Sequence, residues 1–128
     1  MTTLLSIIEL GGYPDFTALY EKTGCEVKVV NSVRKAISFL KKNPVDIIVA
    51  EFNYQTDFRD RTSSLESLMA VLQAYPESKV IIFLDGIHQE KLAKVTSRFN
   101  IFASQTFPID EEQLEKNIVS VIKRKMYE

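Results

Sequence analysis

A buried-strand pattern in the middle of the chain constrains the fold more than any other feature. Residues 45–52 read Val-Asp-Ile-Ile-Val-Ala-Glu-Phe, with four consecutive apolar residues that are mostly β-branched. Such a run predicts a strand that is covered by helices on both faces. The run also places the carboxylate of Glu51 at its C-terminal end. Because ligands of open parallel α/β sheets bind at the carboxyl ends of the strands, Glu51 is a candidate site residue.

Strand-like and helix-like segments alternate along the rest of the chain. Apolar runs predict strands at 4–10, 26–30, 45–52, 79–84 and 101–106. Helical spacing of apolar residues predicts helices at 15–23, 33–42, 64–74, 89–99 and from 110 nearly to the C-terminus. Ser32 and Asp110 are suitable N-caps, and Gly24 is a suitable helix stop. The alternation predicts βαβ units and a parallel sheet in a single domain over residues 1–128.

The charge balance argues against two classes of partner. The 128 residues include 16 basic and 17 acidic ones, for a net charge of −1. We therefore expect no nucleic-acid partner and no binding to an anionic membrane. The N-terminus lacks a basic segment, and Glu9 interrupts its apolar stretch, so we expect neither a signal peptide nor a membrane span. The expected location is the cytoplasm.

The single cysteine and the single histidine exclude several kinds of site. Cys25 has no second cysteine with which to form an internal disulfide, and we expect it to be a small, partly buried hydrophobic residue. His88 is the only histidine of the chain. One cysteine and one histidine are too few for a zinc cluster, and their spacing does not suit a Cys/His catalytic pair.

Two local motifs match one known family. Residues 43–51, Asn-Pro-Val-Asp-Ile-Ile-Val-Ala-Glu, resemble the third strand of response-regulator receiver domains, which ends in the phosphoacceptor Asp. Residues 107–110, Phe-Pro-Ile-Asp, resemble the Lys-Pro-Phe turn of that family before its last helix. The resemblance covers essentially the whole chain. It implies an α/β, flavodoxin-like (βα)5 doubly wound fold with a five-stranded parallel sheet in the order 2-1-3-4-5. It also implies a role in two-component or phosphorelay signalling.

The chain departs from the family at the positions that perform its chemistry. The resemblance implies an acid pair that holds Mg²⁺, a phosphoacceptor Asp, a Ser/Thr hydroxyl and a Lys. At these positions the chain has, in order, Glu9 and Leu10, Glu51, Asp85, and Phe107.

Four of these departures matter for phosphoryl transfer. Leu10 cannot ligate a cation, Asp85 adds a like charge, and Phe107 removes a positive charge. Glu51 is one methylene longer than Asp, and a misplacement of about 1 Å can cost about 100-fold in rate. We therefore expect no phosphoryl transfer, no catalytic residue, no enzyme activity and no cofactor.

Other roles for the acidic residues remain open at this stage. Glu51 could mimic the phosphorylated state, or it could be the remnant of a site that has lost its function. Glu9, Glu51 and Asp85 are weak candidates for a divalent-metal site. The alternative function is therefore a small-molecule or divalent-metal sensor.

Two segments are candidate protein interfaces. Tyr54 and Phe58 lie among charged residues in a long loop, residues 53–63. Val119 and Met126 widen the apolar stripe of the last helix beyond what a core contact requires. The sequence thus predicts a phosphorylation-independent pseudo-receiver that acts as a protein–protein interaction module. Its partner would be another signalling protein or a second copy, in a homodimer through the last helix region.

Overall fold

The computed structural model describes residues 2–8, 16–51, 65–75, 77–84, 101–106 and 109–127. Of residues 65–67 and 125–127 it describes the backbone alone. The strands are β1 (Thr2–Ile7), β2 (Cys25–Val30), β3 (Ile47–Glu51), β4 (Lys79–Leu84) and β5 (Ala103–Thr106). The helices of this part of the chain are α1 (Thr17–Lys22), α2 (Val33–Lys42), α4 (Leu65–Leu72) and α6 (Glu111–Tyr127).

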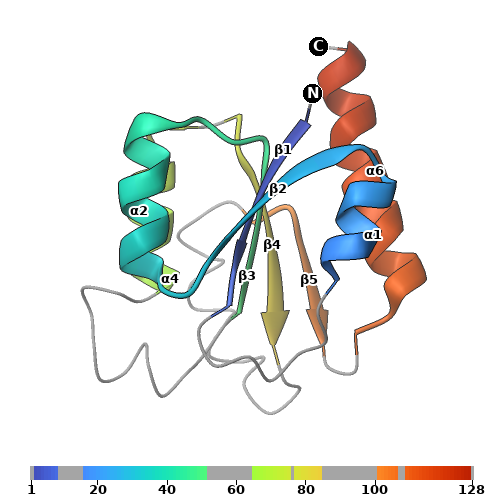
Figure 1. The fold of residues 1–128 in the computed structure, drawn as a ribbon, viewed down its shortest axis with the longest axis horizontal. Coiled ribbons are helices and arrows are strands. Elements are labelled where there is room, and N and C mark those ends of the chain that lie inside the picture. The colour runs from blue at the N-terminus through green and yellow to red at the C-terminus, as the bar shows by residue number, and fades with distance from the viewer. Residues whose placement is uncertain are drawn as a thin grey trace.

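The strands form one parallel sheet in the order β2-β1-β3-β4-β5, which confirms the predicted topology. The register pairs Ile7 with Ala50, Glu51 with Phe83, and Leu84 with Thr106. The strands therefore bring their carboxyl ends to the same edge of the sheet, which is the lower edge in Figure 1.

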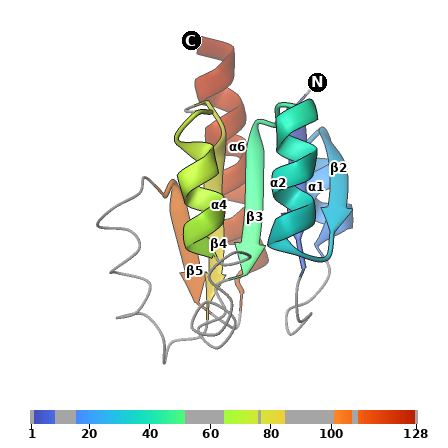
Figure 2. The ribbon, with the colours of Figure 1, turned by 90° about the vertical axis from the view of Figure 1, so that its left-hand side faces the viewer.

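The helices cover both faces of the sheet. Helices α2 and α4 lie on one face, and α1 and α6 lie on the other (Figures 1 and 2). Because side chains alternate along a strand, each central strand contributes to two cores. The core beneath α2 and α4 includes Leu5, Ile7, Val33, Ala36, Leu40, Ile48, Ala50, Leu68, Met69, Leu72, Val80 and Ile82. The core beneath α1 and α6 includes Leu4, Phe16, Tyr20, Cys25, Ile47, Val49, Ile81, Phe83, Leu114, Ile118 and Val121.

Local side chains fix the helix ends. The Ser32 hydroxyl accepts a hydrogen bond of 3.1 Å from the Lys35 backbone N–H, which confirms Ser32 as the N-cap of α2. Asp110 Oδ1 accepts a bond of 3.0 Å from the Glu112 N–H at the start of α6. Gly24 follows α1 with φ of +93°, a left-handed conformation that glycine adopts without strain.

Several predicted boundaries differ from those observed, among them the starts of β1, α1 and β3. Strand β1 begins at Thr2, two residues before the predicted start, because Thr2 and Thr3 pair with Cys25 and Glu26 of β2. Helix α1 begins at Thr17 after Phe16, which provides no side-chain cap. Strand β3 begins at Ile47, and Asp46 just before it contacts Thr3 of β1 through both its carboxylate and its backbone N–H. The predicted helix at 89–99 lies outside the described residues.

Within the described ranges, no helix combines the length and the apolar composition needed to cross a membrane.

Candidate functional site

Glu51 lies at the carboxyl end of its strand, as predicted. It is the last residue of β3, one of the central strands of the sheet. Glu51 is only 7% exposed. A glutamate side chain in water is charged at neutral pH. Buried carboxylates are uncommon in proteins and need polar partners. Glu51 does have an interaction with its surroundings in the structure.

The described surroundings of Glu51 include an aromatic pair. Its neighbour across the β3–β4 ladder is Phe83. The Phe83 ring packs edge to face against Phe16, with ring centroids 5.8 Å apart and an interplanar angle of 79°. Both rings are 5% exposed. The neighbour of Glu51 on β4 therefore belongs to a buried aromatic pair.

The other predicted site positions lie outside the described residues. These are Glu9, Leu10, Asp85 and Phe107. In sequence they follow β1, β4 and β5, which end at the same edge as β3. Within the described ranges there is no group of three His, Cys, Asp or Glu residues that could hold a metal ion. The carboxylate set of Glu9, Glu51 and Asp85 therefore stays a prediction.

Cys25 lies in the core beneath α1 and α6 and is buried, more completely than predicted. Its Sγ lies 3.4 Å from the Thr23 hydroxyl. Burial raises the pKa of the Cys25 thiol above its ordinary value, against the lowering effect of the Thr23 contact, and the charge of Asp46 raises it further. The thiolate, which is the reactive form of cysteine, is therefore disfavoured.

Helix α6 is held firmly on the sheet. Leu114, Ile118 and Val121 are buried against it, and Ile122 packs against the same core. One hydrogen bond and one cation–π contact tie α6 to β5 and to the residue just before it. The Gln105 side-chain amide donates a hydrogen bond of 2.8 Å to Asn117 Oδ1. The Arg124 guanidinium lies 5.3 Å from the centre of the Phe102 ring.

The opposite side of α6 faces away from the sheet and carries one of the predicted interface residues, Val119. Val119 is half-buried. It lines a shallow hollow at the surface of the helix. We call the residues that line this hollow the outer face of α6: Glu112, Glu115, Lys116, Val119, Ser120 and Lys123. The Met126 side chain, Tyr54 and Phe58 lie outside the described part of the chain, so their roles at an interface stay predictions.

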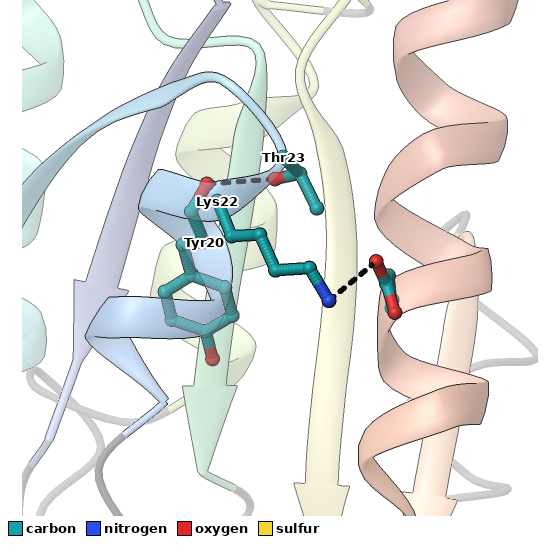
Figure 3. A network of polar contacts seen from close by, with 4 residues as sticks. Tyr20, Lys22 and Thr23 are labelled. Carbon is teal, nitrogen blue, oxygen red and sulfur yellow. Dashed lines mark hydrogen bonds and ion pairs between the residues drawn. The ribbon is translucent and has the colours of Figure 1, made fainter.

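Sequence reasoning missed the charged residues of this face. Lys22 of α1 forms an ion pair of 3.5 Å with Glu115, so that α1 borders the outer face (Figure 3). In the same view the Thr23 hydroxyl donates a bond of 2.7 Å to the Tyr20 carbonyl, which closes the end of α1. The spacing of Glu112, Lys116 and Lys123 at i, i+4 and i+11 was the available signal.

Comparison by sequence alone finds no relative: no family model matches the chain, and no curated protein matches it.

Comparison with solved structures identifies the fold. A receiver domain protein from Clostridium thermocellum superposes with a TM-score of 0.78 at 18% identity, covering 99% of this chain and 98% of that one. The chain has the fold of a response-regulator receiver domain. The receiver domain of a Francisella response regulator gives a TM-score of 0.75 at 17% identity, covering 98% of this chain and 99% of that one.

A third receiver-like structure is longer than this chain. It belongs to a family of streptococcal redox sensors that evolved from two-component response regulators. The TM-score is 0.79 at 17% identity, and the match covers 99% of this chain but 53% of the other. The chain thus spans about half the length of that sensor. The neighbours of this receiver-like chain are signalling domains.

Proposed function

We propose that this receiver-like chain is a phosphorylation-independent pseudo-receiver, a non-enzymatic module that acts in signal transduction by binding another protein. The observation that carries the proposal is the burial of Glu51. The resemblance assigns this position to the phosphoacceptor, which must meet a phosphodonor and a metal. Glu51 is instead buried beside the closed Phe16–Phe83 pair.

The chemistry of the remaining positions supports the same proposal. In-line attack on a phosphoryl group needs an accessible oxygen at the correct distance, together with positive charge around the transferred group. The longer side chain of Glu51 displaces its oxygens, and Leu10 and Phe107 supply neither a metal ligand nor a cation. A module that cannot accept a phosphoryl group still has the receiver fold. Such a module can act by binding another protein through its surface.

Cys25 does not support a thiol-based redox role for this chain. A thiol-based sensor needs an accessible cysteine with a low pKa. The chain has one cysteine, Cys25, which is buried, and its pKa is raised by that burial.

The proposal is tested by offering the chain a phosphoryl group. The purified chain is incubated with acetyl phosphate and Mg²⁺, and separately with beryllofluoride and Mg²⁺. Intact-mass spectrometry is expected to show no phosphoryl adduct, and the near-ultraviolet spectrum is expected not to change. A receiver that carries the complete acid, Asp, hydroxyl and Lys set serves as the positive control.

A Glu51→Asp variant is the matched control. It restores the shorter carboxylate while Leu10, Asp85 and Phe107 stay in place. We expect this variant to remain unmodified as well, because attack still lacks metal and cation. A phosphoryl adduct on the unmodified chain would overturn the proposed function.

A further inference from the structure

We propose that the outer face of α6 binds the same face of a second copy of this chain, with the two helices antiparallel. The inference rests on the proposed function, since it names the partner and the surface of the interaction module. Three features of the described residues carry it: the direction of the face, the charges on it, and its symmetry.

The outer face points directly away from the core. At 100° per residue, Glu112, Lys116, Val119 and Lys123 lie along one ridge of the helix. Leu114, Ile118 and Val121 lie on the opposite side and are at most 4% exposed. The ridge is therefore free to meet another surface without disturbing the contacts that hold α6 on the sheet.

The charges of α6 are divided along its length. Its first part carries Glu111, Glu112 and Glu115, and its last turns carry Lys123, Arg124 and Lys125. Glu115 already pairs with Lys22. Among the described residues, Glu112, Lys116 and Lys123 form no ion pair within the molecule. The face thus presents a negative end and a positive end, both available to a partner.

The residues of the face are arranged symmetrically. About an axis between positions 117 and 118, residue 112 exchanges with 123, 115 with 120, and 116 with 119. In an antiparallel pair about that axis, Glu112 of each copy meets Lys123 of the other, which gives two ion pairs about 16 Å from end to end along the helix. In the middle, the aliphatic stem of Lys116 covers Val119 of the second copy. A two-fold interface requires this kind of self-complementarity.

The charge arrangement decides between a second copy and a different partner. A uniformly acidic or basic face would favour a partner of the opposite charge. A face whose two ends have opposite charges is complementary to itself when it is turned end for end. One helix face is a small interface, so a weak dimer with a Kd on the order of 10–100 μM is expected.

The test is charge reversal, measured by sedimentation equilibrium across a range of concentrations. Glu112→Lys places Lys against Lys123 in both contacts, and Lys123→Glu places Glu against Glu112. Each variant is expected to weaken the dimer by roughly tenfold. The double variant Glu112→Lys/Lys123→Glu restores opposite charges and is expected to recover the unmodified Kd. An equimolar mixture of the two single variants is expected to form mixed dimers.

Matched controls reverse charges elsewhere on the surface. Glu77→Lys and Lys41→Glu change exposed residues that do not line the outer face, and both are expected to leave the Kd unchanged. Raising the salt concentration from about 50 mM to about 0.5 M is expected to weaken the dimer, because the ion pairs are exposed.

Two outcomes would overturn the inference. One is a chain that stays monomeric up to about 1 mM. The other is a dimer that the single reversals leave intact, or that the double variant fails to restore. Neither outcome affects the proposed function, whose own test is the phosphoryl adduct. If the chain is monomeric and forms no phosphoryl adduct, the proposed function stands, and the partner is a different protein.

Discussion

At the scale of single residues, Cys25 offers the clearest consequence of burial. Its thiol lies in the core beneath α1 and α6, where the charged thiolate is disfavoured and the pKa is raised. In the unfolded chain the thiol loses its proton near its ordinary pKa of 9.0, before the folded chain does. The contribution of Cys25 to stability is therefore complete below that pH and is lost as the pH rises through the folded pKa.

We expect this loss to depend on the sulfur. Urea unfolding of the unmodified chain and of Cys25→Ala is compared at about pH 8 and about pH 10. The unmodified chain should lose more stability between the two pH values than the variant does. The variant serves as the control for all other groups that titrate in this range. Equal losses in the two proteins would show that the thiol titrates alike in the folded and unfolded states.

The sequence located Glu51 correctly but not what surrounds it. Its place at the strand end follows from the apolar run before it, because a buried strand must deliver its last residue to the sheet edge. Its neighbour Phe83 comes from another strand, and Phe16 comes from the segment before α1. The edge-to-face pair depends on the β3–β4 register and the packing of α1. A single sequence contains no direct signal of either.

At the scale of elements, α2 shows how local chemistry sets a boundary. The Ser32 hydroxyl satisfies the Lys35 N–H, one of the backbone donors without a helical acceptor at the first turn. We expect Ser32→Ala to lower the free energy of unfolding by about 1 kcal/mol. The measurement is urea unfolding followed by far-ultraviolet circular dichroism. Ser32→Asn keeps a capping oxygen and should lose little. An equal loss in both variants would assign the effect to something other than the cap.

The bounds of an element were predictable where a clear apolar pattern defined it, or where residues that begin and end helices enclosed it. Helix α2 and strand β4 match their predicted bounds, because Ser32 and Asn43 enclose the first and a buried run defines the second. The starts of β1 and β3 were wrong. Contacts between distant segments lie at both starts: the Asp46 carboxylate binds Thr3, 43 residues away. The first residues of β1 also pair with β2, Thr2 with Cys25, and pairing between distant segments leaves no periodic trace in the sequence.

At the scale of the whole molecule, the sheet order was predictable because the alternation of elements leaves few topologies. Right-handed crossovers and two covered faces follow from βαβ units. The family resemblance then supplied the order, which the structure confirms. The outer face of α6 was only partly foreseen. Val119 was recognised as apolar excess, whereas the division of charge along the helix becomes meaningful once the buried side of α6 is known.

The two cores share the same sheet, so they should unfold together. Ile48 of β3 packs beneath α2 and α4, and Ile118 of α6 packs on the other face; both are fully buried. We expect Ile48→Val and Ile118→Val each to lower the free energy of unfolding by about 1 kcal/mol. The pair should be additive within about 0.5 kcal/mol, because the two side chains belong to separate cores.

Two probes can test whether the faces form one cooperative unit. The chain has no tryptophan and five tyrosines, so tyrosine fluorescence can be compared with far-ultraviolet circular dichroism during urea unfolding. In each variant both signals should shift to the same lower midpoint with an unchanged slope. Separate transitions, with Ile48→Val moving one and Ile118→Val moving the other, would mean that the faces unfold independently. A shared transition follows physically from β3 and β4, whose alternate side chains supply both cores, so that neither core can open while the other keeps its strands in register.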